Sequence, residues 1–151
     1  MEDEIKNIHK LLLRTFQKNA WHGPAVKEVL ETITAEQAYR RLPESHSIIE
    51  LVAHMTAWRI FVIKKLQGDP EYKVKEEMNF PAIANWSEAV QALDKSQADL
   101  LEALEAFDNA KLHEIVQHIS YNYPFYTLLH GIIHHDLYHI GQIAIIRKQP
   151  F

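Results

Sequence analysis

The chain has 151 residues, of which 47% are hydrophobic and 24% charged, which is typical of one globular domain, so we expect a single domain over residues 1–151. The formal net charge of −4 and the lack of a long basic run argue against nucleic acid as a partner, because no positive surface would follow a phosphate backbone. The absence of cysteine excludes disulfides, cysteine-ligated zinc and a thiol nucleophile of the protein itself.

The amino terminus is polar and leads into an amphipathic helix. Residues 1–10 lack the basic and then apolar pattern of a signal peptide, and no apolar run reaches the roughly 20 residues of a membrane helix. We therefore expect a cytoplasmic protein that does not insert into a membrane. From Glu4 to Lys18, apolar residues recur at intervals of three and four, which predicts the first long helix.

Two short helical segments are expected next. Gly23 and Pro24 end the first helix, and Pro24 suits the first turn of a short helix over residues 24–33. Thr34 and Gln37 have the spacing of a capping box, which predicts one further helical turn.

The second long helix is expected over residues 48–66. Ser47 and Glu50 again have the spacing of a capping box at its start. Residues 67–84 carry two prolines and no clean periodicity, so we expect a long loop, in which residues 72–74 give only a weak strand signal. A loop of this length often lies over a functional site.

The second half of the chain supplies two more long helices, over residues 87–107 and 125–148. The connection over residues 108–125 contains an alternating segment, 112–120, that favours an extended conformation. Four long amphipathic helices without a convincing strand predict an all-α four-helix bundle. The long connecting loops favour at least one crossover between helices.

The last helix is rich in histidine, with four in residues 129–142 (LHGIIHHDLYHIGQ). Residues four apart lie about 40° from one another around a helix, so His135 and His139 share one otherwise apolar stripe and should face the core. His134 lies about 100° from that stripe and His130 lies further away, so both are expected on a flank or on the surface.

The second long helix has one histidine, His54, on its inward apolar stripe. A buried imidazole without a hydrogen-bond partner destabilises the folded protein by a few kcal/mol. Three of them in one core are therefore unfavourable unless they bind a ligand. Neutral imidazole is a common ligand of zinc, nickel, copper and iron, and two histidines four apart can reach one ion. The pattern therefore predicts a metal site of His54, His135 and His139 with an open position.

Alternatives to a metal site stay open at this point. The histidines can be hydrogen-bonded core residues, or can titrate near pH 6 in a metal-free bundle. His46, just before the second long helix, can support the site but is not expected as a ligand. Asp136 stands where the metalloprotease motif His-Glu-x-x-His has glutamate, so peptide hydrolysis has little support. Two roles stay open for Asp136. Its side chain can make a contact on the helix surface or with the second long helix, or its carboxylate can support a ligand histidine.

The segments SIIELVAHMTAWRIFVIKKLQGD (47–69) and LLHGIIHHDLYHIGQIAIIRK (128–148) resemble the DinB and YfiT-like family of small metal-binding four-helix proteins. The resemblance covers nearly the whole chain, and HDLYHIGQI (135–143) is its most specific element. It implies an up-down-down-up bundle, a ligand set of His54, His135 and His139, zinc or nickel with water completing the shell, and frequent dimerisation.

The resemblance leaves the activity open, because the family includes thiol S-transferases, a thiol-dependent isomerase and many members without a known reaction. One hypothesis is a metal-dependent enzyme, a thiol S-transferase or a hydrolase, acting on a small molecule with an external low-molecular-weight thiol or with water. Tyr138 and His134, on the flank of the ligand stripe, and Trp58, near His54, are candidates for groups near the open position, with simple packing as the alternative. The other hypothesis is a stress-related homodimer in which the ion is structural or sensory.

Overall fold

The computed structural model describes residues 4–118, 120 and 122–150 of the chain. The four long helices are α1 (Glu4–Phe16), α4 (Ile48–Leu66), α6 (Trp86–Glu105) and α7 (Phe125–Ile146). The shorter helical segments are α2 (Val26–Leu30), α3 (Ala35–Tyr39), α5 (Glu76–Asn79) and the 3-10 turn η1 (Asn109–Lys111). No strand forms within the described residues, so the predicted all-α class is confirmed.

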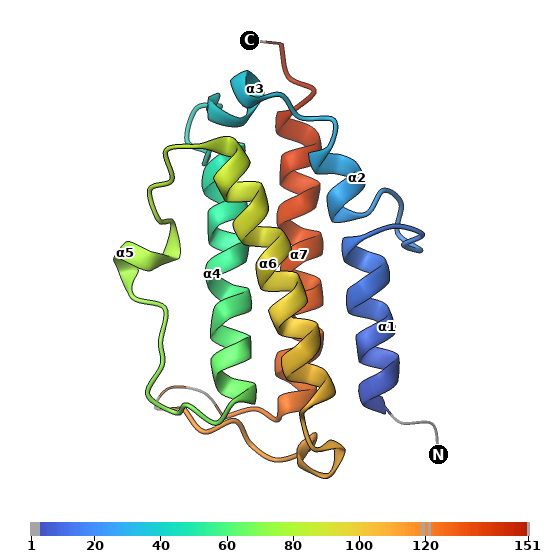
Figure 1. Ribbon diagram of the computed structural model, residues 1–151. Helices are drawn as coiled ribbons and strands as arrows, with labels where there is room; N and C mark the ends of the chain where they lie inside the picture. The colour runs from blue at the N-terminus through green and yellow to red at the C-terminus, as the bar shows by residue number, and fades with distance from the viewer. Residues whose placement is uncertain (1–3, 119, 121, 151) are drawn as a thin grey trace.

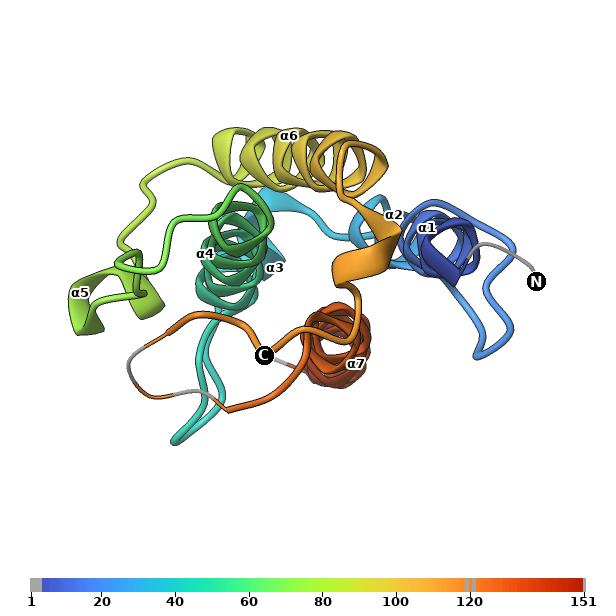
Figure 2. The ribbon, with the colours of Figure 1, turned by 90° about the horizontal axis from the view of Figure 1, so that it is seen from below.

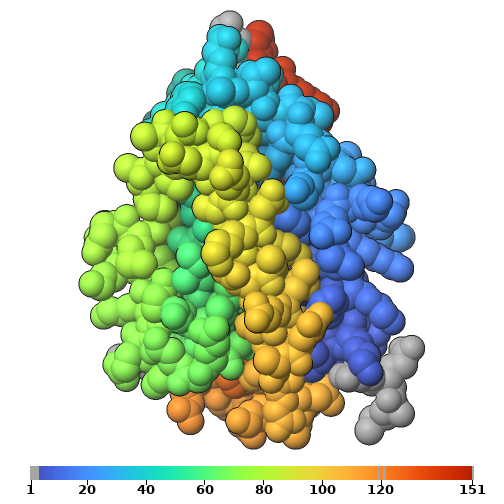
Figure 3. Space-filling view, in the orientation of Figure 1, coloured from blue at the N-terminus to red at the C-terminus, as the bar shows by residue number. Residues whose placement is uncertain are grey.

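The long helices run up, down, down and up in chain order, so the predicted bundle topology is confirmed (Figure 1). Seen along the helix axes, α6 lies opposite α7 and α4 lies opposite α1 (Figure 2). Each long helix therefore packs on two others: α4 and α1 each contact both α6 and α7. In the space-filling view, α6 covers the front of the molecule and hides most of α7 (Figure 3).

The crossover is the connection between α4 and α6, which returns along the outside of α4 and carries α5 (Figure 1). The expected loop over residues 67–84 thus contains one helical turn that its sequence did not indicate, because four residues are too few to show a helical period. The expected extended segment 112–120 forms a single antiparallel bridge, between Ile115 and Pro124, and residue 119 lies outside the described residues.

Both capping boxes form as predicted. The Thr34 hydroxyl accepts a hydrogen bond from the Gln37 backbone N–H at 3.2 Å, and the Ser47 hydroxyl accepts one from the Glu50 backbone N–H at 3.4 Å. At α6 the expected start was one residue late. The side chain of Asn85 accepts hydrogen bonds from the first-turn backbone and caps a helix that begins at Trp86.

The core consists of two apolar clusters, one at each end of the bundle. On α4 the first cluster ends at Met55 and the second begins at Phe61; on α7 the second cluster ends at Ile133 and the first begins at Ile140. Between the clusters lies a layer of buried polar side chains, which includes His54, Arg59, Gln97, Asp136 and His139. None of the helices in the described part of the chain is long and apolar enough to span a membrane.

Candidate metal centre

Three histidines meet in this polar layer, His54 from α4 and His135 and His139 from successive turns of α7. We call them the histidine triad. The Nε2 atom of His135 lies 3.0 Å from Nε2 of His54 and 3.1 Å from Nε2 of His139. One ring nitrogen from each residue lies within 4.8 Å of the other two, and this is a group able to hold a metal ion. His54 and His139 are buried, with 7% and 6% of their surface exposed, and His135 is half-buried.

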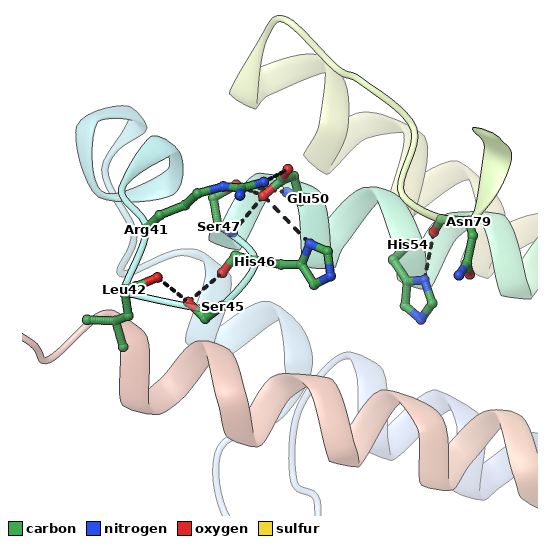
Figure 4. Close-up of polar contacts among 8 residues, drawn as sticks. All are labelled: Arg41, Leu42, Ser45, His46, Ser47, Glu50, His54 and Asn79. Atoms are coloured by element: carbon green, nitrogen blue, oxygen red, sulfur yellow. Dashed lines mark hydrogen bonds and ion pairs between the residues drawn. The ribbon is translucent and has the colours of Figure 1, made fainter. Parts of the chain in front are cut away.

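In two of these rings, a hydrogen bond at Nδ1 determines which ring nitrogen carries the proton. Nδ1 of His54 donates to the backbone carbonyl of Asn79 at 2.7 Å (Figure 4), and Nδ1 of His139 donates to Oε1 of Gln142 at 2.7 Å. Because these oxygens can only accept, both Nδ1 atoms carry the proton and both Nε2 atoms present a lone pair to the centre. His135 Nε2 can donate to only one of them, so the three rings cannot satisfy one another.

Burial keeps the triad neutral, which is the state that binds a metal. Burial, together with the neighbouring imidazoles of His139 and His54, which would repel a second proton, and the charge of Arg59, lowers the pKa of His135 to about 3. Burial also lowers the pKa of His54 and of His139 below the ordinary value for histidine. Ligands at 2.0–2.1 Å from one tetrahedral ion are roughly 3.4 Å apart, close to the separations of 3.0 and 3.1 Å between these Nε2 atoms. The donor set therefore fits a divalent ion that prefers nitrogen.

The loop between α4 and α6 covers the triad. Besides accepting from His54, Asn79 accepts a hydrogen bond at its side-chain oxygen from the Trp58 indole, at 2.9 Å. The next residue, Phe80, stacks on the His54 ring at 4.2 Å and on the His46 ring at 3.7 Å. His46 is thus separated from the triad by the Phe80 ring. Sequence reasoning placed a loop near a functional site but missed Asn79 and Phe80, because nothing in that aperiodic segment marks a residue that contacts a helix.

Trp58 also forms one wall of an open pocket between α4 and α7, with a volume of about 260 Å³, that reaches His135. We call it the α4–α7 pocket. It is lined by Trp58, Phe61, Val62, Tyr123, Thr127, Leu128, Gly131, Ile132 and His135. One of the three candidate ligands is therefore accessible from an apolar hollow.

The other two candidates for groups near the open position, Tyr138 and His134, lie outside this pocket. The ring of Tyr138 is 5.0 Å from that of His139, but 66% of the residue is exposed. His134 is exposed and lies beside His130, with 6.3 Å between ring centroids, and none of its described ring contacts is with the triad. Of the three candidates, only Trp58 contacts both the pocket and the cover of the site.

Asp136 does not lie on the surface of the bundle. It is 1% exposed and forms an ion pair with Arg59 of α4, which also donates to Gln97 of α6. Of the alternatives for Asp136, the structure therefore shows the contact with the second long helix, α4. None of the described hydrogen bonds of Asp136 is to a histidine. The physical reason is that α7 is buried on more than one side, so a residue 100° from the ligand stripe still faces another helix.

Comparison with protein families gives the class of this chain. Residues 19–143 match the model of the DinB superfamily, and this range includes the whole histidine triad. The chain belongs to the DinB superfamily. No curated protein and no solved structure matches it significantly.

Proposed function

We propose that His54, His135 and His139 bind one divalent metal ion, zinc or nickel, and that the ion serves a reaction of the thiol S-transferase or hydrolase type. The observation that carries the proposal is the convergence of three neutral imidazoles, two of which have their Nε2 lone pairs aimed at one space by hydrogen bonds at Nδ1. Lone pairs removed from water in this way are unfavourable unless a hydrogen-bond donor or a cation accepts them, and His135 can donate to only one of the two.

A bound ion would supply a Lewis acid that lowers the pKa of an external low-molecular-weight thiol, or of water, in its open position. The side chains of the α4–α7 pocket would hold the second reactant next to His135. Trp58 is fixed in that wall by its hydrogen bond to Asn79, so it would orient the reactant without first having to be ordered. Since the protein has no cysteine, a reacting thiol would come from solution.

A non-catalytic role is the second candidate, and the placement of the nearby acidic groups favours it. Asp136 is paired with Arg59, and Glu50 accepts hydrogen bonds from Ser47 and Arg41 (Figure 4). Neither carboxylate is available as a general base for the triad. In this alternative the ion joins α4 to α7 in a structural or sensory site of a cytoplasmic homodimer, and light scattering of the purified protein measures the dimer directly.

The experiment that separates the two functions uses protein loaded with zinc or nickel. Transfer of bacillithiol, glutathione or cysteine to a generic electrophile, and hydrolysis of a generic ester, are measured for the wild type, for His135→Ala and for His22→Ala. His22 is an exposed histidine before α2 and serves as the control. The enzyme proposal predicts a metal-dependent rate that His135→Ala abolishes and His22→Ala retains. If no thiol and no ester gives such a rate, the structural or sensory role is the better account.

A further inference from the structure

The helix α7 contains two interior glycines, Gly131 and Gly141, that its packing does not require. A glycine inside a helix is less favourable than alanine, because its backbone loses more conformational freedom on folding. Both residues have ordinary helical backbone angles, and a Cβ atom added at either position would meet nothing within 4 Å. Neither a close approach of another element nor an unusual backbone angle therefore explains them.

The two glycines differ in what lies beside them. Gly131 is one turn before His135 and lines the α4–α7 pocket, whereas Gly141 does not line it. A side chain at position 131 would project into the space next to His135. At position 131, unlike position 141, the absence of a side chain leaves room in the pocket.

The chemistry of the pocket defines what can occupy that room. Its lining is aromatic and aliphatic apart from His135 and the hydroxyl groups of Thr127 and Tyr123, and the described lining residues include no aspartate, glutamate, lysine or arginine. A charged group placed there would lose hydration without gaining an ionic partner. An apolar cavity of about 150 Å³ accepts a benzene ring, so a pocket of about 260 Å³ has room for an uncharged group of about two fused rings.

We propose that the α4–α7 pocket binds the uncharged, apolar or aromatic part of a small-molecule substrate, and that Gly131 sets the size of the group it accepts. The inference rests on the proposed function, because it places this group beside an ion held by the histidine triad. A small molecule fits better than a protein segment, since the pocket is small, with a volume of about 260 Å³ that is just below the usual range for small-molecule pockets, and His135 is among its lining residues.

The test is binding of 2-naphthol, an uncharged bicyclic probe, measured by equilibrium dialysis with and without a chelator. The variants are Gly131→Ala and Gly131→Leu in the pocket, with Gly141→Leu as the matched control on the same helix. The charged probe 2-naphthalenesulfonate has the same rings and tests the requirement for an uncharged ligand. Circular dichroism of each variant shows that the helices are retained, and Gly131→Ala supplies a conservative change should Gly131→Leu fold poorly.

We expect the wild type to bind 2-naphthol more tightly than the sulfonate, Gly131→Leu to bind it about tenfold more weakly, and Gly141→Leu to bind it like the wild type. Gly131→Ala should fall between the wild type and Gly131→Leu. Equal affinities for the two probes, or no effect at position 131, would overturn the proposal. So would a dimer, measured by light scattering, that dissociates only in Gly131→Leu, because a second copy would then occupy this face.

The outcome of this binding test can be distinguished from the outcome of the test of the proposed function. Binding of 2-naphthol that survives the chelator while no metal-dependent reaction is found would keep the pocket assignment and reject the enzyme. A metal-dependent reaction without any effect of Gly131→Leu on 2-naphthol affinity or on the electrophiles accepted would keep the enzyme and reject the role of Gly131.

Discussion

Arg59 of α4 and Asp136 of α7 form an ion pair that is removed from solvent, with 0% and 1% of these residues exposed. The pair joins the same two helices as the histidine triad, and Asp136 directly follows His135. Loss of one partner leaves an uncompensated charge inside the bundle, which typically costs about 3–5 kcal/mol. We therefore expect Asp136→Ala to lower the free energy of unfolding by about this amount. Urea denaturation of the chelator-treated protein, followed by circular dichroism, measures it.

Two controls accompany this prediction. The double variant Arg59→Met/Asp136→Leu removes both charges and should recover most of the lost stability, because apolar side chains can replace a buried ion pair. Asp99→Ala removes the exposed i,i+4 partner of Lys95 and should change stability by less than about 0.5 kcal/mol. An Asp136→Ala protein as stable as Asp99→Ala would contradict the structural importance of the buried pair.

Asn79 is expected to support the metal site from outside it. Asn79→Ala removes the acceptor of the Trp58 indole and loosens the segment whose backbone carbonyl accepts from His54. Loss of such an outer partner typically weakens metal binding 10- to 100-fold, and because the carbonyl itself is retained we expect a loss of about tenfold. Competition with a chromophoric chelator measures the affinity. Asn79→Asp keeps an acceptor oxygen and should stay nearer the wild type; equal affinities for Asn79→Ala and the wild type would show that the segment does not position the ligand.

The metal-free protein should lose stability as the pH falls below about 6.5. His135 has a pKa of about 3 in the folded protein, because of burial, of the neighbouring imidazoles of His139 and His54 and of the charge of Arg59, while an unfolded histidine has one near 6.5. Between these values the unfolded chain binds a proton that the folded protein does not, so the stability present above about pH 6.5 is lost progressively at lower pH.

Urea denaturation in the presence of a chelator, at about pH 7.5 and about pH 5.5, tests this dependence in a range where carboxylates scarcely titrate. His135→Gln cannot take up the proton and should show a smaller difference between the two conditions. A wild type whose stability does not change with pH, or a variant with the same slope, is inconsistent with a buried neutral His135.

The histidine triad could be predicted from the sequence mainly because of the helical period. His54, His135 and His139 stand on apolar stripes whose 3.6-residue period directs them to the interior, and the structure brings their ring nitrogens together from two facing helices. The bundle itself was predictable for the same reason, since all four long helices have an apolar stripe. The local capping boxes at Thr34 and Ser47 were also visible, because they depend only on residues three apart.

The parts that could not be predicted depend on contacts between distant segments. Asn79 reaches His54 from an aperiodic connection, and its backbone carbonyl, which any residue would supply, makes the contact. Arg59 is fully buried although charged residues are normally exposed, and its pairing with Asp136, 77 residues later, together with its hydrogen bond to Gln97, makes the position favourable. The sequence signal for such a pair was the nearly continuous apolar character of α4 on both sides of Arg59, which leaves this residue no solvent-facing side.

The most direct test of the account is the amount of metal bound per chain. Protein purified without a histidine tag is loaded with zinc or nickel, desalted and analysed by mass spectrometry for metal, for the wild type, for His54→Ala, His135→Ala and His139→Ala, and for the control His22→Ala. We predict about one ion per chain in the wild type and in His22→Ala, and a small fraction of that in each triad variant. A wild type that binds no ion, or triad variants that retain a full equivalent, would contradict a metal centre at these histidines.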